Sequence, residues 1–141
     1  MKKLITISAL LCASMQAAPA PVADAAMKGD KNAVKALIAQ KADVNAVQAD
    51  GATAIQWAAY RDDATLAEML IAAGADVKKA NREGFTPLVL ASINGSSAMI
   101  QKLLKAGAGA NDPDNNGDTP LMFASRNGNV DAIKVLLDAG A

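Results

Sequence analysis

The sequence predicts an all-α repeat solenoid, a stack of short helix pairs, from three observations. The first is self-similarity: DGATAIQWAAYRDD at residues 50–63 returns as EGFTPLVLASINGS at 83–96 and as NGDTPLMFASRNGN at 116–129, each copy 33 residues after the last. The second is composition, because 52% of the residues are apolar and only 3% are aromatic, which favours thin, closely packed helices over a β-sandwich core. The third is the helical spacing of apolar residues within a copy.

The first helix of a copy is clearest at residues 86–94. Thr86 is expected to cap it through its side chain, and Pro87 occupies the first helical position, where a missing N–H costs nothing. The residues that follow are apolar on nearly every side, so this helix must lie between neighbouring helices. Gly95 then permits a tight turn.

The second helix of the same copy is predicted from a stripe of apolar residues. Met99, Ile100, Leu103 and Leu104 share one face at helical spacing, and Gly107 is placed to end the helix through a left-handed cap. A turn-rich stretch at residues 108–117 leads to the next copy. One such helix pair cannot bury its own apolar faces, so stability must come from stacking.

The 33-residue period, the TPLxxA pattern, the mid-repeat glycine and the terminal Gly-Ala together closely resemble the ankyrin-repeat family. The resemblance covers roughly residues 20–141 and implies an L-shaped stack of helix pairs with β-hairpin fingers at right angles. It also implies that the partner is another protein. We expect one ankyrin-repeat domain at 21–141. It should consist of an N-terminal capping repeat at 21–49, full repeats at 50–82 and 83–115, and an incomplete repeat at 116–141.

The chain departs from the family pattern at the histidine of TPLH. Gln56, Val89 and Met122 stand there, and in the family that histidine ties backbone groups together. We therefore expect weaker hydrogen bonding between repeats, offset by apolar packing at Val89 and Met122. The second copy is the loosest match, because it also has Ala54 for proline and Asp62 for glycine.

The two ends of the array are expected to differ. The first copy has Asp24 where the second has Trp57, so a polar residue replaces a core residue, as in a capping repeat with a solvent-facing outer side. The fourth copy predicts an exposed apolar end, because it keeps Leu121, Phe123, Ile133, Val135, Leu136 and Leu137. Such an end indicates either that further repeats follow or that it meets a partner, self-association included.

Residues 1–20 have the three-part layout of a secretory signal peptide that is removed: a basic head, an apolar run and a small-residue stretch. The apolar run is well short of the ~20 residues that a membrane-spanning helix needs, so no membrane span is expected after removal. Acylation of Cys12, as in a lipoprotein, is disfavoured because the bulky Leu11 precedes it. The mature chain is expected in the bacterial periplasm or outside the cell.

Composition excludes several classes of function. The chain has no histidine, which removes Ser–His–Asp and Cys–His catalysis and imidazole zinc sites. Its 14 basic and 14 acidic residues balance, so no basic footprint for nucleic acid is present. We expect no enzyme activity, no cofactor and no metal.

Three features could carry chemistry, and each has a structural interpretation that we favour. The stretch at Asp112–Asp118 resembles the opening of an EF-hand calcium loop, but its twelfth position is Phe123 in place of a bidentate glutamate, which favours a polar finger. Trp57 is interpreted as a core residue, with a ligand platform as the alternative. Asp62 and Asp63 are interpreted as solvated, because adjacent carboxylates on a turn diverge.

The predicted function is a non-catalytic protein–protein interaction module or scaffold that acts through a preformed concave surface. The alternatives are the targeting module of a longer enzyme or effector whose catalytic domain lies beyond residue 141, and a simple structural spacer. By the resemblance, contacts lie on the fingers and the first helices, where Tyr60, Ile93 and Arg126 form a column beside an exposed Phe85. The full predicted partner-binding set is Tyr60, Arg61, Arg82, Glu83, Phe85, Ile93, Asn94, Asn115, Asn116, Asp118, Arg126 and Asn127.

Overall fold

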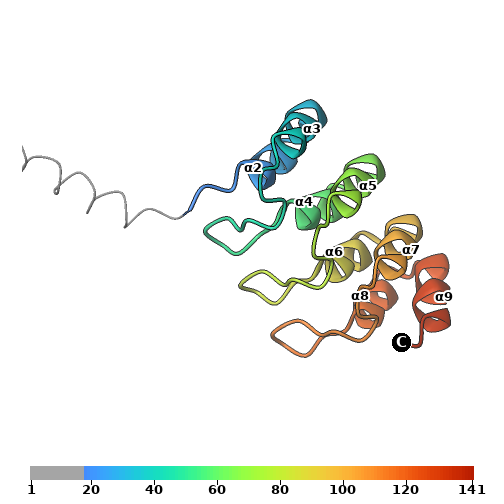
Figure 1. The fold of residues 1–141 in the computed structure, drawn as a ribbon. Helices are drawn as coiled ribbons and strands as arrows, with labels where there is room; N and C mark the ends of the chain where they lie inside the picture. Colours follow the sequence, from blue (N-terminus) through green and yellow to red (C-terminus); the bar gives the residue numbers. More distant parts are fainter. Residues whose placement is uncertain (1–17) are drawn as a thin grey trace, which may run out of the picture.

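The computed structural model describes residues 18–141 of the chain, so most of the predicted signal peptide lies outside the described residues. Residues 18–141 form eight α-helices and no assigned β-strand. The helices are α2 (Pro21–Lys28), α3 (Lys31–Ala39), α4 (Ala54–Tyr60), α5 (Ala64–Ala72), α6 (Pro87–Asn94), α7 (Ser97–Lys105), α8 (Pro120–Asn127) and α9 (Val130–Asp138). Figure 1 shows these helices stacked as pairs in chain order, which confirms the predicted all-α repeat solenoid.

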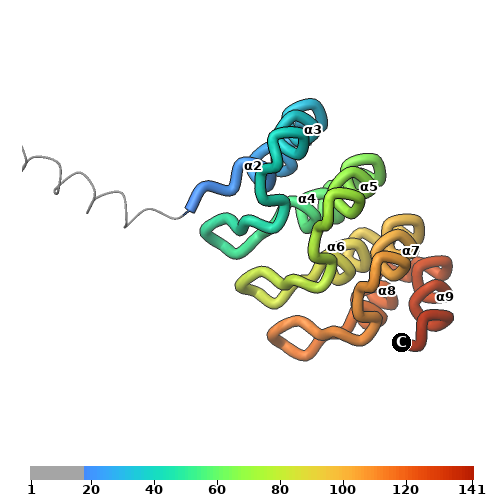
Figure 2. The backbone as a smooth tube through the Cα atoms, viewed as in Figure 1, coloured from blue at the N-terminus to red at the C-terminus, as the bar shows by residue number. Residues whose placement is uncertain are grey.

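Three loops between successive pairs extend to the same side of the stack as fingers (Figures 1 and 2). We define them as the first finger (46–52), the second finger (79–85) and the third finger (112–118). Each is closed like a hairpin by two backbone bonds, which in the second finger run from the amide of Asn81 to the carbonyl of Phe85 at 3.1 Å and from the amide of Gly84 to the carbonyl of Asn81 at 3.0 Å. The fingers are therefore hairpin-like turns, too short and irregular to count as strands.

The helix starts follow from local sequence. Thr86 caps α6 as predicted, because its hydroxyl accepts a hydrogen bond from the amide of Val89 at 3.2 Å, and Pro87 is the first residue of that helix. The second helix of every copy is also capped by a side chain that accepts from the amide three residues later. These caps are Asp30, Asp63, Ser96 and Asn129.

The turn between the two helices of a copy needs a left-handed residue. Gly95 has φ 68° there, as predicted, and Asp62 occupies the same position of the second copy with φ 54°. Aspartate tolerates this conformation better than most residues, although still at a cost. The second copy is thus strained where its sequence departs from the repeat.

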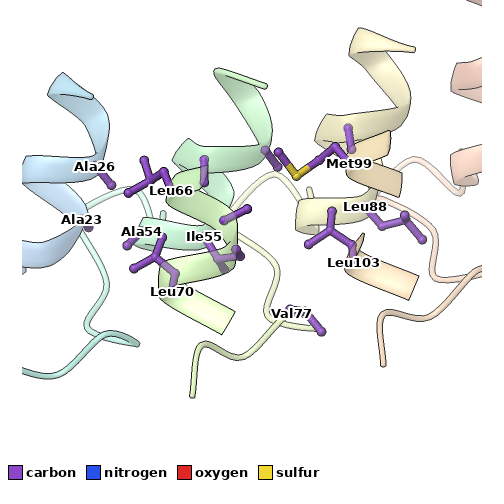
Figure 3. Close-up of a cluster of buried hydrophobic side chains, with 14 of the residues drawn as sticks. Ala23, Ala26, Ala54, Ile55, Leu66, Leu70, Val77, Leu88, Met99 and Leu103 are labelled. Carbon is purple, nitrogen blue, oxygen red and sulfur yellow. The ribbon is translucent and has the colours of Figure 1, made fainter. Parts of the chain in front are cut away.

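The core runs as a continuous row through the stack. Figure 3 shows apolar side chains from successive copies, including Ile55, Leu70, Leu88 and Leu103, meeting between the helices. All four are fully buried, and burial of each such side chain contributes roughly 1.5–3 kcal/mol. Small residues such as Ala91 allow the first helices to approach closely.

The histidine replacements behave differently from one another. Gln56 makes backbone contacts of its own: its Oε1 accepts from the amide of Thr53 at 3.4 Å, and its Nε2 donates to the carbonyl of Lys79 at 2.7 Å. Both bonds lie within the second copy (50–82), so they do not test the expected weakening of hydrogen bonding between repeats, which stays a prediction. Apolar packing replaces such bonding at Val89, which is fully buried, but not at Met122, which is half exposed.

The ends of the described chain also differ from one another. Asp24 is exposed and accepts a hydrogen bond from Gln48 of the first finger, so it faces the fingers. Asp24 is thus a polar, exposed residue at the repeat position of Trp57, and the assignment of 21–49 as an N-terminal capping repeat stays a prediction.

The apolar end of the fourth copy is exposed only in part: of the six residues on which it was predicted, Leu137 is 51% exposed, Leu136 is fully buried and the other four are half buried. Met122 at 49% and Val130 at 59% are exposed as well. Self-association through this surface stays a prediction.

Candidate partner-binding face

The fingers and the first helices α4, α6 and α8 together form one surface, which we call the inner face. A hollow of about 310 Å³ opens on it between the first two fingers, and we call this the inner pocket. The residues that line it come from α4, α6 and both fingers. They are Asp50, Ala52, Gln56, Trp57, Tyr60, Asn81, Glu83, Phe85 and Leu90.

Two perpendicular aromatic rings from α4 line the inner pocket. The ring centroids of Trp57 and Tyr60 lie 5.7 Å apart with an interplanar angle of 88°. Trp57 is held by its Nε1, which donates to Oε1 of Gln48 at 2.7 Å, and Gln48 in turn donates to Asp24 at 2.6 Å. The interpretation of Trp57 as a core residue is thus only partly right, because it packs on the core but lines the pocket half buried.

A second aromatic pair continues the inner face toward α8. Phe85 and Phe123 meet edge to face at 6.3 Å between centroids, so Phe85 is half buried and not the exposed aromatic that the sequence predicted. The guanidinium carbon of Arg126 lies 5.3 Å from the Phe123 centroid. Both terminal nitrogens of Arg126 also donate to Asp118, at 3.1 and 3.3 Å.

The predicted column along the first helices is present and open to solvent. Tyr60 is 60% exposed and Ile93 is 39% exposed, and Arg126 is exposed beside them on α8. Asn116 is also exposed, at the tip of the third finger. Tyr60, Ile93 and Asn116 are open to solvent, whereas the exposed Arg126 is also paired with Asp118 and packed on Phe123.

Asn115 joins neighbouring fingers to one another. Its Nδ2 donates to the carbonyl of Arg82 at 2.7 Å, and its amide donates to that of Glu83 at 3.4 Å. The amide of Arg82 donates in turn to the carbonyl of Asp50 at 3.0 Å. The three fingers therefore form a connected ledge, with the side chains of Arg82 and Glu83 exposed along it.

Three further predicted contact residues, besides Asn115, have side chains that hold one copy to the copy before it. Nδ2 of Asn94 donates to the carbonyls of Ala59 and Tyr60 at 3.0 and 2.8 Å. Asn127 repeats this pattern on the end of α6, and Arg61 donates to the carbonyl of Met27 at 3.2 Å. This bonding gives Arg61, Asn94 and Asn127 a role in stacking that the sequence analysis did not assign.

The sequence analysis did not assign Trp57, Leu90, Asn81 or Gln56 to a binding site, although all four line the inner pocket. A signal was available for two of them. Trp57 and Leu90 share their repeat position with Asp24, and a position that accepts a carboxylate in one copy is at least partly open to water.

The finger at Asp112–Asp118 uses its carboxylate for its own turn. Oδ1 of Asp114 accepts from the amides of Asn116 and Asp118, both at 2.9 Å. Asp63 likewise caps α5 and pairs with Lys31 at 3.1 Å. Among residues 18–141, no group of three or more His, Cys, Asp or Glu side chains gathers that could hold a metal ion.

The fold and this open face define a class of protein, the repeat solenoid that offers a surface built from successive copies. A family model described as ankyrin repeats (3 copies) matches residues 22–114 and 63–141. The chain therefore belongs to the ankyrin-repeat family. Ankyrin repeats generally mediate protein–protein interaction and are typically non-catalytic. A comparison with curated proteins found no matching sequence.

No helix in the part of the chain that the structure describes is long and apolar enough to cross a membrane.

Proposed function

We propose that the chain is a non-catalytic interaction module that presents its inner face to a partner protein outside the cytoplasm. The observation that carries this proposal is the inner pocket, where Trp57, Tyr60 and Phe85 line an open hollow. Large aromatic side chains dominate the binding energy of protein interfaces. An exposed tyrosine beside two further aromatic residues is therefore a fitting anchor for a partner.

The inner face is preorganised, which favours tight binding. Trp57 is held by its hydrogen bond to Gln48, Phe85 by its contact with Phe123, and the fingers by the bonds of Asn115. Each group that is already fixed loses less conformational freedom on docking, and about 0.5–1.5 kcal/mol is saved for each side chain that need not be immobilised.

The decisive experiment is affinity capture with an inner-face variant. The triple variant Tyr60→Ala, Phe85→Ala, Arg126→Ala removes exposed and half-buried contacts from α4, the second finger and α8. We expect it to lose a specific protein that the wild type captures, since interface anchors cost roughly 2 kcal/mol or more each when truncated. Identical capture profiles would contradict the proposal and support a structural spacer.

The matched control is a triple variant on the second helices, which line the opposite side of the stack. Lys35→Ala, Gln101→Ala and Lys134→Ala change exposed residues of α3, α7 and α9 and should leave capture unchanged. Because Phe85→Ala also removes a packing contact, circular dichroism must show that the inner-face variant is folded. Tyr60→Ala alone, at a largely exposed position, provides a milder variant for the same comparison.

The location outside the cytoplasm rests on the layout of residues 1–20, with its basic head and apolar run. Mass spectrometry of the protein purified from cell fractions tests it directly. We expect a mature N-terminus near residues 18–21 in the periplasmic or extracellular fraction. An intact Met1 in the cytoplasmic fraction would overturn this part of the proposal and leave the interaction role untouched.

A further inference from the structure

The inner pocket combines aromatic walls with two carboxylates. Asp50 of the first finger and Glu83 of the second finger line it together with Trp57, Tyr60 and Phe85. Neither carboxylate takes part in an ion pair among residues 18–141, where the acidic partners in ion pairs are Asp63, Glu68 and Asp118. The pocket thus has two acidic groups that are not engaged in an ion pair with any of the described residues.

The finger ledge fixes the carboxylate of Asp50 and the backbone around Glu83. Oδ1 of Asp50 accepts from the amide of Ala52 at 3.0 Å, which leaves its second oxygen available. The carbonyl of Asp50 accepts from the amide of Arg82, the residue next to Glu83, and this bond keeps the two fingers together. The two acidic groups therefore come from adjacent, connected segments at the pocket.

The neighbouring part of the inner face shows which group suits such a site. Arg126 lies over the ring of Phe123 and donates through two nitrogens to Asp118. A guanidinium is stabilised there by an aromatic ring and a carboxylate at once. The inner pocket, in the second and third copies, also has aromatic rings and carboxylates. It has no guanidinium of its own at this position, because Tyr60 and Ile93 occupy the repeat position of Arg126 in those copies.

A guanidinium satisfies both kinds of group because it is planar, stacks on aromatic rings and binds carboxylates through paired donors. Cation–π contacts contribute about 0.5–2 kcal/mol, depending on exposure. The volume of about 310 Å³ lies at the low end of ligand pockets, roughly 300–1,000 Å³, and suits one inserted side chain.

We propose that the inner pocket receives an arginine side chain of the partner protein. The proposal rests on the proposed function and specifies the chemistry of the partner at that same face. One local cation competes with it, because Arg82 lines the adjoining hollow with Asp50 and Glu83. Removing that charge is expected to strengthen binding of an incoming arginine.

Trp57 makes the proposal measurable, since it is the only tryptophan of the chain and lines the pocket. The probe is a blocked tripeptide with a central arginine, titrated against the intact mature protein while tryptophan fluorescence is recorded. The control peptide carries citrulline, which has a similar shape and no charge. We expect saturable binding of the arginine peptide with Kd on the order of 1 mM, and at least about tenfold weaker binding of the citrulline peptide.

The carboxylates are tested by the double variant Asp50→Asn, Glu83→Gln. Asparagine can still accept from the amide of Ala52, so the first finger keeps its turn. We expect arginine-peptide affinity to fall about tenfold in this variant. The matched control, Asp131→Asn with Asp138→Asn, makes the same change in net charge on the outer helix α9 and should leave affinity unchanged.

Equal affinity for the arginine and citrulline peptides would overturn the proposal, as would the absence of saturable binding. An equal loss in both double variants would also overturn it, because net charge alone would then explain binding. These failures are distinct from failure of the proposed function. That function fails only if the inner-face triple variant captures the same proteins as the wild type.

Discussion

The third and fourth copies have nearly the same motif but different surroundings. Leu88 is fully buried between α4 and α8, whereas Leu121, at the matching position of the last described copy, is half buried. Val89 is likewise buried, and Met122 is not. Burial in this fold is therefore a property of a residue's place in the stack as much as of its place in the motif.

Matched glycines show the same difference. A Cβ atom on Gly84 would lie 2.5 Å from the amide nitrogen of Asn115 in the next finger, but a Cβ atom on Gly117 would meet nothing within 4 Å. Both residues have positive φ, 85° and 86°. Interior positions thus carry two constraints, one from the local turn and one from the neighbouring copy.

The largest expected effect is in the core. Leu88→Ala should lower the free energy of unfolding by about 3–5 kcal/mol, because it opens a cavity between two copies, and Leu121→Ala by roughly 1–2 kcal/mol, because water already reaches that site. Urea denaturation of both variants provides the measurement. Equal losses would show that the last copy is packed as tightly as an interior one.

Glycine substitution separates the turn from the neighbouring copy. Gly117→Ala should cost about 1–2 kcal/mol, the strain of a left-handed alanine, and Gly84→Ala about 1 kcal/mol more because it also displaces the third finger. Urea denaturation gives the difference between the two. A chemical-shift change at Asn115 should accompany Gly84→Ala alone.

Removal of the asparagine amides tests the junctions between copies. Asn94→Ala and Asn127→Ala should each lower the free energy of unfolding by about 1–2 kcal/mol, because each variant loses two hydrogen bonds to backbone carbonyls of the preceding first helix. Hydrogen exchange should locate the effects differently: Asn127→Ala loosens α8 and α9, and Asn94→Ala loosens the helices on both sides of its junction. Unchanged exchange in both variants would show that these residues do not stabilise the junctions between copies, and would leave partner binding as their role.

The smallest expected effect is at an exposed position. Met122→Gln should change stability by less than about 0.5 kcal/mol, since Met122 faces water and Gln56 already occupies the same repeat position. Val89→Gln would instead bury an amide and should cost roughly 1–3 kcal/mol. Comparable thermal shifts for the two variants would remove the distinction between interior and terminal copies.

The helices were predictable because their signals are local and repeated. A threonine cap, a proline at the first helical position and a stripe of apolar residues occur at fixed intervals, so each copy supports the assignment of the others. Asp63 was harder to interpret, because a cap for α5 and a solvated carboxylate look alike until the helix start is known. The hydrogen bond from Gln56 to the carbonyl of Lys79 was missed because Lys79 is in the loop that follows α5.

The candidate site was less predictable because it depends on contacts between copies. The sequence analysis assigned both Tyr60 and Asn94 to the partner-binding set, yet Tyr60 projects to solvent and the Asn94 side-chain amide binds the preceding helix. In repeat numbering Asn94 is only one residue after the position of Tyr60. This shift of one residue moves the side chain from the solvent-exposed inner face to the contact between two copies. The sequence analysis placed Trp57 in the core because the matching residues of later copies are apolar. A half-buried aromatic side chain, however, can pack on the core and line a pocket at the same time.

The bonds of Asn94 and Asn127 end on backbone carbonyls, which every copy possesses whatever its side chains. A duplicated unit of 33 residues, inserted in register, would find the same acceptors already in place. The array can therefore grow by tandem duplication without new compensating substitutions at its junctions. Each added unit would bring another finger and another stretch of inner face, free to diverge in sequence.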